Sequence, residues 1–200
     1  MLSLLKNVNR YNFILASQSP RRYELLKMIG LKFKVRPSHI DEIYQDHLQP
    51  SEYAVKNAKK KGAFIALKYP ESIVIAADTI VILKDEILEK PKDEAHAYTI
   101  LKRLNGKTHK VITGFGFIAE GMQKSLFDYD VTEVTFRKLT QNEIKTYINT
   151  GEPFDKAGGY GAQGHGSLLI KSVNGCFFNV VGLPLAKFFI LLDKFLLRLS

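Results

Sequence analysis

Residues 73–83 read IVIAADTIVIL, a nearly continuous apolar run with one carboxylate, Asp78, near its centre. A run of this length without polar alternation is typical of a strand that is buried on both faces. An ionised carboxylate in such a strand loses much of its hydration, which is costly unless a cation or hydrogen-bond donors compensate. Asp78 is therefore either a structural hydrogen-bond hub or a functional group, such as a metal ligand or a general base.

Segments with helix-like and strand-like patterns alternate along the rest of the chain, which predicts an α/β protein. No linker, low-complexity segment or internal repeat interrupts the 200 residues, so we expect a single domain over 1–200. The expected strands are 12–17, 31–36, 73–83, 107–117 paired with 126–137, and 167–173 paired with 177–181. The expected helices are 20–29, 51–69, 93–104, 141–149 and 184–197.

The composition is that of a globular and strongly basic protein. Hydrophobic residues make up 46% of the chain and charged residues 24%, and the formal net charge is +9 with a pI near 9.5. This charge favours polyanionic partners, namely nucleotides, nucleic acids or acidic lipids, but a solvated basic surface also explains it. The charge alone therefore leaves the partner open.

Cysteine content and hydropathy bear on the compartment. The single cysteine, Cys176, excludes an internal disulfide, fits a reducing compartment and is expected to be a small core residue. The start of the chain lacks the pattern of a secretory signal. The apolar C-terminal stretch carries Lys187, Asp193, Lys194 and Arg198, too many charges for a membrane span. We therefore expect a cytoplasmic protein that does not act at a membrane.

Residues 17–22, SQSPRR, lie where the first expected strand gives way to a helix, a common ligand position in open α/β sheets. Ser19 is the expected N-cap and Pro20 the first helical residue. The free N–H groups of the first helical turn and the forked donors of Arg21 and Arg22 suit a phosphate group. The alternative is an ordinary N-cap followed by two solvated arginines.

Several other charged residues are of interest because they occur together in one chain. They are Asp41, Glu42, Lys61, Glu89 and Lys90. On the expected helix 51–69, either Lys59 or Lys61 could lean into a cleft at the edge of the sheet. Mg²⁺ prefers hard oxygen ligands and phosphates prefer cations, so carboxylates combined with lysines and arginines are what a metal–triphosphate site needs. Taken one at a time, each of these charges is more often a solvated surface group.

Residues 158–166, GGYGAQGHG, contain five glycines. Glycines allow a backbone to approach a ligand closely, and Gln163 offers both a donor and an acceptor for a base edge. The G-x-G-x-x-G pattern from Gly159 to Gly164 is not a dinucleotide-binding signature, because no strand precedes it and the residues after it look extended. The alternative is a flexible loop. P-loop, zinc-site and serine-hydrolase patterns are absent from the sequence.

In this order and spacing, these segments resemble the Maf family of nucleoside-triphosphate pyrophosphatases. The matching motifs are LASQSPRRYELL (15–26), IDE (40–42), AADTIV (76–81), LEKPKD (88–93), LNGKTHKVITG (104–114), GEPFDKAGGYGAQGHG (151–166) and VVGLPL (180–185). The resemblance implies a Maf/ITPase-like α/β fold with an elongated mixed sheet, flanking helices and a central nucleotide-binding cleft. It also implies a homodimer, and it leaves residues 1–10 outside the family pattern as an N-terminal extension.

The resemblance implies a Mg²⁺- or Mn²⁺-dependent hydrolase that cuts between the α and β phosphates and releases pyrophosphate. The loop 155–164 is similar to the branch that acts on dTTP and UTP. Modified pyrimidine nucleotides are further candidate substrates, whose incorporation such an enzyme would prevent. Carried over by motif, the roles are Asp78 as proton acceptor, Glu42 and Asp78 at the metal, Ser19, Arg22, Lys61 and Lys90 at the triphosphate, and Arg21, Thr79 and Gln163 in base selection.

The sequence departs from the family pattern at three small residues, Gly62, Gly159 and Ala162, which bears on base preference and not on the reaction. Two other interpretations stay open. The family is linked to septum formation and cell-division arrest, so the first is a basic nucleic-acid-binding or septum-regulatory protein without turnover. No recognised nucleic-acid motif supports it, and nucleic acid is not an expected partner. The second is a phosphatase that releases orthophosphate.

Overall fold

The computed structural model describes residues 8, 10–40 and 48–199 of the chain. These residues form two compact units built from interleaved stretches of sequence. Unit 1 comprises Met1–Asp78, Thr113–Asp130 and Gly182–Ser200, and unit 2 comprises Thr79–Ile112 and Val131–Val181. The single domain expected over 1–200 stays a prediction.

The strands have the order β2-β1-β3-β5-β6-β7, with β4 paired to β3. In unit 1, β1 (Phe13–Leu15) runs parallel to β2 (Lys34–Val35) and to the first residues of β3 (Ile73–Leu83). In unit 2, the end of β3 pairs antiparallel with β4 (Glu86–Leu88). The sheet contains both parallel and antiparallel pairs, so the expected mixed α/β class is confirmed.

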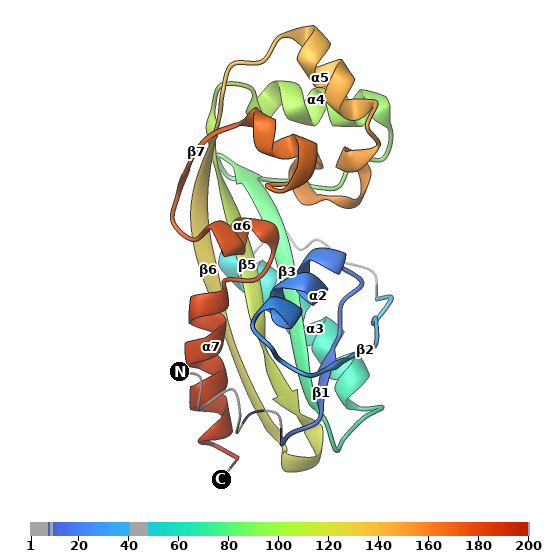
Figure 1. The fold of residues 1–200 in the computed structure, drawn as a ribbon, viewed down its shortest axis with the longest axis vertical. Helices are drawn as coiled ribbons and strands as arrows, with labels where there is room; N and C mark the ends of the chain where they lie inside the picture. Colours follow the sequence, from blue (N-terminus) through green and yellow to red (C-terminus); the bar gives the residue numbers. More distant parts are fainter. Residues whose placement is uncertain (1–7, 9, 41–47, 200) are drawn as a thin grey trace. The chain divides into compact units, whose positions relative to one another are not determined.

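The three longest strands each contribute residues to both units. The strand β3 has the expected bounds and is buried at every position except the half-buried Thr79. The strands β5 (Thr108–Ala119) and β6 (Lys124–Phe136) are neighbours joined by the short 3-10 helix η1 (Glu120–Met122), as Figure 1 shows. The expected hairpin is therefore confirmed.

Unit 1 contains the helices α2 (Pro20–Met28), α3 (Pro50–Ala66) and α7 (Leu185–Leu196). In α2, Ser19 caps the helix by accepting a hydrogen bond from the Arg22 N–H, and Pro20 occupies the first turn, as expected. In α3, Gln49 and Glu52 form a capping box. The strongly amphipathic α7 places Phe188 and Phe195 against Phe117 of β5, with ring centroids 5.1 and 5.4 Å away.

The helix α3 packs closely on the sheet through small side chains. Ala54, Ala58, Gly62 and Ile65 are buried at helical spacing. A Cβ atom at Gly62 would lie 2.9 Å from the Cβ of Ala76, so a hydrogen in place of a side chain permits this approach. The close packing places the next positions of the helix, among them Lys61, directly over β3.

Unit 2 has its own core between two amphipathic helices and the sheet. The helices are α4 (Glu94–Leu104), capped by Asp93, and α5 (Gln141–Ile148), capped by Thr140. They lie side by side in Figure 1. Residues 152–169 form three short 3-10 helices, η2 (Glu152–Asp155), η3 (Ala157–Gly159) and η4 (Gly164–Leu169).

One expected pair of strands is wrong. Residues 177–181 form the helix α6 (Phe177–Val181), and the expected strand at 167–173 is reduced to β7 (Ile170–Asn174), which pairs antiparallel with β6. The cause is a buried amide: Asn179 Nδ2 donates to Val111 O at 3.0 Å and to Thr132 Oγ1 at 2.9 Å. These non-local hydrogen bonds outweigh the β propensity of a Phe- and Val-rich segment.

Cys176, expected in the core, is only half-buried at the start of α6. Its N–H donates to Thr132 Oγ1 at 3.1 Å, and its carbonyl oxygen accepts from the same hydroxyl at 3.1 Å. The backbone of Cys176 therefore fixes the turn into α6. Among the described helices, none combines the length and the apolar character that crossing a membrane requires.

Candidate functional site

The turn from β1 into α2 is built around two serines. Ser17 is 8% exposed, and its Oγ accepts hydrogen bonds from Ser19 N at 3.2 Å and from Arg22 Nη1 at 3.0 Å. Ser19 Oγ accepts from Arg22 N at 3.4 Å. One hydroxyl therefore satisfies an N–H group of the first helical turn, while the other fixes an arginine beside it.

The two adjacent arginines, Arg21 and Arg22, differ in burial. Arg22 is 9% exposed, and its Nε donates to Gly182 O at 2.9 Å. Ser17 Oγ and Gly182 O are neutral acceptors that orient the guanidinium. The alternative of a solvated arginine is therefore wrong for Arg22, whereas Arg21 is half-exposed. A held cation beside a helix N-terminus suits an anionic ligand.

Asp78, in the middle of β3, is 3% exposed. Lys61 Nζ lies 2.6 Å from its Oδ1, and Asn57 Nδ2 donates to its Oδ2 at 3.3 Å. The two partners are four residues apart on α3, so they share one face of the helix. The buried carboxylate therefore has both a compensating cation, Lys61, and a hydrogen-bond donor, Asn57.

The pair is largely buried, unlike an ion pair on the protein surface. The side chains of Lys61 and Asp78 are 15% and 4% exposed. A buried ion pair contributes little net stability, because desolvation offsets the attraction between the charges. A carboxylate retained there against that cost is a candidate to accept a proton or to bind a cation.

The donor atoms at Asp78 fit a hard divalent cation that arrives with a polyphosphate. Asp78 supplies a carboxylate, and Asn57 beside it carries an amide oxygen. Within the described residues, no group of three or more His, Cys, Asp or Glu side chains could hold a metal by itself. Mg²⁺ commonly binds through one or two carboxylates together with phosphate oxygens and water, and Asp78 supplies one such carboxylate. The other expected ligand, Glu42, lies outside the described residues.

The remaining predicted residues belong to unit 2. Thr79 is half-buried and follows Asp78 in β3, Lys90 is exposed just after β4, and Gln163 is exposed between η3 and η4. The expected roles of Thr79, Lys90 and Gln163 at the substrate stay predictions.

The glycine-rich stretch is a folded element of unit 2. Tyr160 is 6% exposed, and its hydroxyl lies 2.7 Å from His109 Nε2. Burial lowers the pKa of His109 to about 4, so the imidazole is neutral near pH 7. The flexible-loop alternative is therefore wrong for the segment that contains Tyr160, and the chain around Gln163 has a defined conformation.

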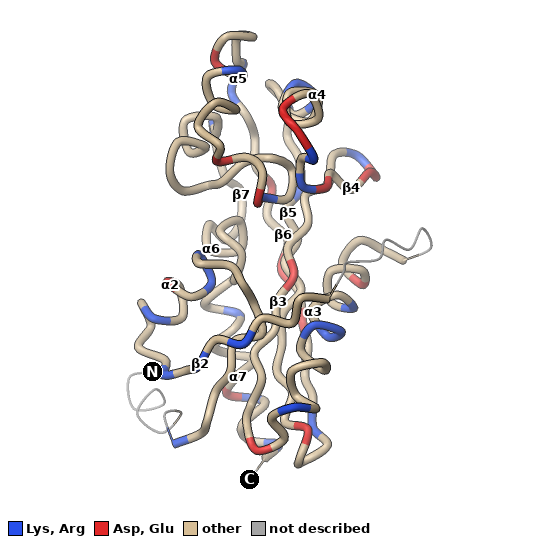
Figure 2. Tube along the Cα trace, turned by 90° about the vertical axis from the view of Figure 1, so that its right-hand side faces the viewer, with Lys and Arg blue, Asp and Glu red and all other residues tan. Residues whose placement is uncertain are grey.

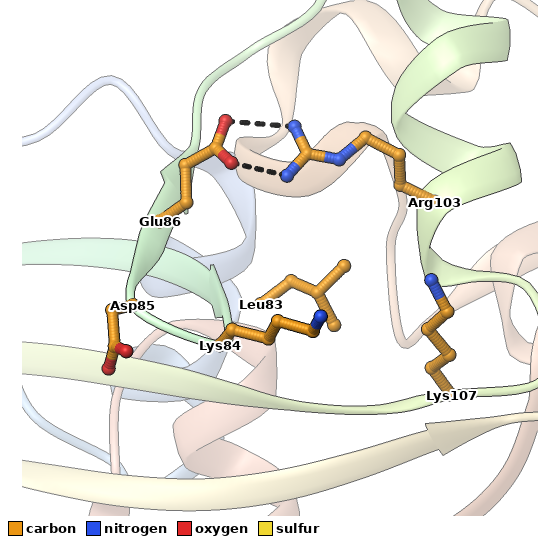
Figure 3. Close-up of a pocket in the computed structure, with 6 residues that line it drawn as sticks. All are labelled: Leu83, Lys84, Asp85, Glu86, Arg103 and Lys107. Atoms are coloured by element: carbon orange, nitrogen blue, oxygen red, sulfur yellow. Dashed lines mark hydrogen bonds and ion pairs between the residues drawn. The ribbon is translucent and has the colours of Figure 1, made fainter.

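Unit 2 also has a hollow of about 530 Å³ (Figure 3). Its lining residues are Leu83, Lys84, Asp85, Glu86, Arg103 and Lys107. Arg103 binds Glu86 through two nitrogens, at 2.8 and 2.5 Å. This hydrogen bonding lowers the pKa of Glu86 and raises that of Arg103. None of the residues predicted for the site lines this hollow.

Sequence reasoning missed three groups at the site. They are Ser17, Asn57 and the carbonyl of Gly182. Asn57 could have been found from its spacing, because it precedes Lys61 by one helical turn. The contact between Gly182 and Arg22 joins residues 160 positions apart, and no local pattern indicates it.

Comparison with known proteins agrees with these motifs. A dTTP/UTP pyrophosphatase of Bacillus pumilus is 47% identical over 91% of this chain and 95% of its own length. One of Caldicellulosiruptor saccharolyticus is 45% identical over 90% and 93%. Among solved structures, the Staphylococcus aureus Ham1 protein covers 80% of this chain and 79% of its own, with 16% identity and a TM-score of 0.46. The model of the Maf-like protein family matches residues 12–195. The chain therefore belongs to the Maf family.

Proposed function

We propose that this protein is a nucleoside-triphosphate pyrophosphatase that converts dTTP and UTP to the monophosphate and pyrophosphate in the cytoplasm. The observation that carries the proposal is the buried carboxylate of Asp78, held by Lys61 at 2.6 Å within a Maf-family chain. Relatives that are 45% and 47% identical are dTTP/UTP pyrophosphatases, which supports this substrate class. Modified pyrimidine nucleotides are further substrates to test.

In the proposed mechanism, Asp78 takes a proton from the water that attacks the α-phosphorus. The bond between the α-phosphorus and its bridging oxygen breaks, and pyrophosphate leaves with the bridging oxygen. Lys61 orients one oxygen of the carboxylate, and Asn57 fixes its second oxygen. Arg22, already oriented by Ser17 and Gly182, binds phosphate oxygens whose charge grows as pyrophosphate leaves.

The other predicted residues are proposed to bind the same substrate. Ser19, Lys61 and Lys90 bind the triphosphate, and Arg21, Thr79 and Gln163 select the base. Mg²⁺ or Mn²⁺, when bound, neutralises phosphate charge, and Asp78 together with Glu42 would hold it.

Product analysis tests this proposal. Purified protein is incubated with Mg²⁺ or Mn²⁺ and with dTTP, UTP, CTP, ATP or GTP, and pyrophosphate and orthophosphate are measured separately. We expect pyrophosphate and monophosphate in equal amounts, fastest with dTTP and UTP, and no turnover in excess EDTA. Orthophosphate as the first product would instead favour the phosphatase interpretation and overturn the proposal.

The alternative of a nucleic-acid-binding or septum-regulatory protein without turnover is not favoured. Figure 2 shows lysine and arginine on helices of both units and not along one stripe. Binding to DNA and RNA is measured at several salt concentrations, and only tight binding with a steep salt dependence would revive this alternative. The homodimer implied by the family is proposed as well, and sedimentation analysis tests it.

A further inference from the structure

The carboxylate of Glu152 lies at the centre of the glycine-rich turn that carries Gln163. Glu152 Oε1 accepts hydrogen bonds from Tyr147 Oη at 3.0 Å and from Gly166 N at 3.1 Å. Its Oε2 accepts from His165 N at 3.0 Å. Three donors therefore converge on the Glu152 side chain. An ionised carboxylate has two oxygens and can accept hydrogen bonds from all three donors.

The start of the same turn is held by the partner of Glu152. Gly161 N, at the start of the turn, donates to Tyr147 Oη at 3.2 Å. The same phenol donates to the carboxylate of Glu152, which binds the amides of His165 and Gly166 at the end of the turn. Gln163 lies between these two anchored ends, with its side chain exposed. Within unit 2, the backbone position of Gln163 is thus set by a hydrogen-bonded pair of side chains.

This arrangement explains two of the glycines, Gly164 and Gly166, which the sequence connects with the close approach of a ligand. A Cβ atom at Gly164 would lie 2.9 Å from Glu152 Oε2, at a φ of +69° that other residues rarely adopt. A Cβ atom at Gly166 would lie 2.8 Å from Tyr147 Oη and 2.2 Å from Gly161 O. These glycines therefore let the chain wrap closely around its own Glu152–Tyr147 pair.

The charge state of the pair suits this role. Burial raises the pKa of Glu152, but hydrogen bonds from Gly166, Tyr147 and His165 outweigh burial, and the net pKa is lowered. Burial, with Glu152 nearby, raises the pKa of Tyr147 above its ordinary value. Near pH 7 the carboxylate is thus a permanent acceptor and the phenol keeps its proton.

We propose that Glu152 is a positioning residue, which fixes the turn 161–166 and through it the discrimination that Gln163 exerts between nucleotide bases. The inference rests on the proposed function for the role of Gln163. Glu152 itself does not touch the substrate in this proposal. It acts through the backbone amides of His165 and Gly166.

Glu152→Gln is the decisive variant, because an amide nitrogen cannot accept the hydrogen bonds that one carboxylate oxygen accepts. The first readout is amide hydrogen exchange of residues 161–166 in the protein without nucleotide, which is independent of activity. The second is the ratio of kcat/KM for dTTP to that for CTP. Glu143→Gln is the matched control. Like Glu152, Glu143 accepts a backbone hydrogen bond in unit 2, from Thr140 N, and it pairs with Arg137, but it lies outside the turn.

We expect Glu152→Gln to speed exchange at His165 and Gly166 and to lower the dTTP/CTP ratio about tenfold, mainly through KM, with kcat within about threefold. Glu143→Gln changes neither quantity. In a Gln163→Ala background, Glu152→Gln has no further effect on the ratio, because its action passes through Gln163. A Tyr147→Phe variant, which keeps the carboxylate, gives a smaller change in the same direction and replaces Glu152→Gln if that variant does not fold.

The failures of the two proposals are distinguishable. If Gln163→Ala changes the ratio and Glu152→Gln does not, the positioning role is wrong and the proposed function stands. If Gln163→Ala leaves the ratio unchanged, the base-selecting role of Gln163 fails, and the inference about Glu152 fails with it. Unchanged exchange at His165 and Gly166 in a folded Glu152→Gln protein also overturns the inference.

Discussion

Lys61 Nζ on α3 lies 2.6 Å from Asp78 Oδ1 on β3, and the two residues are 17 positions apart in the sequence. The contact fixes one oxygen of the carboxylate within a largely apolar strand. It also means that a cation binding at Asp78 must share the carboxylate with the lysine. The chemistry proposed for Asp78 can therefore be separated from its structural role by variants on each side of this pair.

Asp78→Asn is expected to keep the fold and to lower kcat for dTTP by about 10²–10⁴-fold, the usual contribution of a general base. The asparagine retains the shape of the side chain but cannot take up a proton. Pyrophosphate release is measured, with circular dichroism as the check of folding. Asp85→Asn, at an exposed position of unit 2, is the control and should keep full activity. A folded Asp78→Asn protein with normal turnover would show that another group is the base.

Lys61→Met is expected to destabilise the protein by about 2 kcal/mol or more, because it leaves the charge of Asp78 without its closest cation. Turnover should fall as well. Lys60→Met, at the adjacent exposed position, should change unfolding free energy by less than about 0.5 kcal/mol. Denaturant unfolding at pH 7 compares the two variants. Equal losses in both would mean that the contact with Asp78 contributes nothing specific.

Arg22→Lys is expected to lower kcat/KM by about 10–100-fold, since an ammonium group cannot reproduce the forked geometry that Ser17 and Gly182 now orient. Initial rates over a range of dTTP concentrations separate KM from kcat. Arg36→Lys, at an exposed arginine of the same unit, serves as the control and should behave as the parent protein. Full activity in Arg22→Lys would place the phosphate elsewhere.

Gln163→Glu is expected to change the relative rates across a nucleotide panel more than the maximal rate with any one of them. A carboxylate keeps the acceptors of the amide but loses its donor, so a base edge that needs the donor is rejected. Gln141→Glu introduces the same charge at another exposed position of unit 2 and controls for electrostatics. A parallel fall in rate with every nucleotide would argue against base reading by Gln163.

His109 gives a prediction for pH. Its folded-state pKa of about 4 lies below the ordinary value of 6.5, so the unfolded chain binds more protons between these values and stability falls as the pH falls. Between pH 7 and pH 5 this group removes about 2 kcal/mol of unfolding free energy. Denaturant unfolding at both pH values should show a smaller fall for His109→Gln. An identical fall in both proteins would mean that His109 does not titrate as stated.

Much of unit 1 could be predicted because its signals are local. The apolar run at β3 needs no context to be recognised as a buried strand, and Ser19 followed by Pro20 predicts the start of α2. The same holds for Asp78, whose burial follows from its neighbours. What local patterns could not select was the lysine, because Lys59 and Lys61 are close to equivalent until the helix is placed on the sheet.

The failures in unit 2 have the opposite cause. The helix α6 depends on Asn179, whose amide binds groups 68 and 47 residues away in the chain. The Glu152–Tyr147 pair was missed because its acceptors and donors are backbone groups of a turn whose shape no sequence pattern specifies. In both cases the local structure depends on a polar side chain and not on the spacing of apolar residues.

The missing side chain at position 62 has a consequence for relatives of this protein. Because a Cβ there would come within 2.9 Å of Ala76 and 3.1 Å of Ile118, the volumes at these three positions are complementary. A related chain with alanine at position 62 should carry a smaller residue on the facing strand, or else hold α3 slightly higher. The reach of Lys61 to Asp78 therefore depends on matched side-chain sizes at positions 62, 76 and 118, so changing any one of them alone should alter the distance between Lys61 and Asp78.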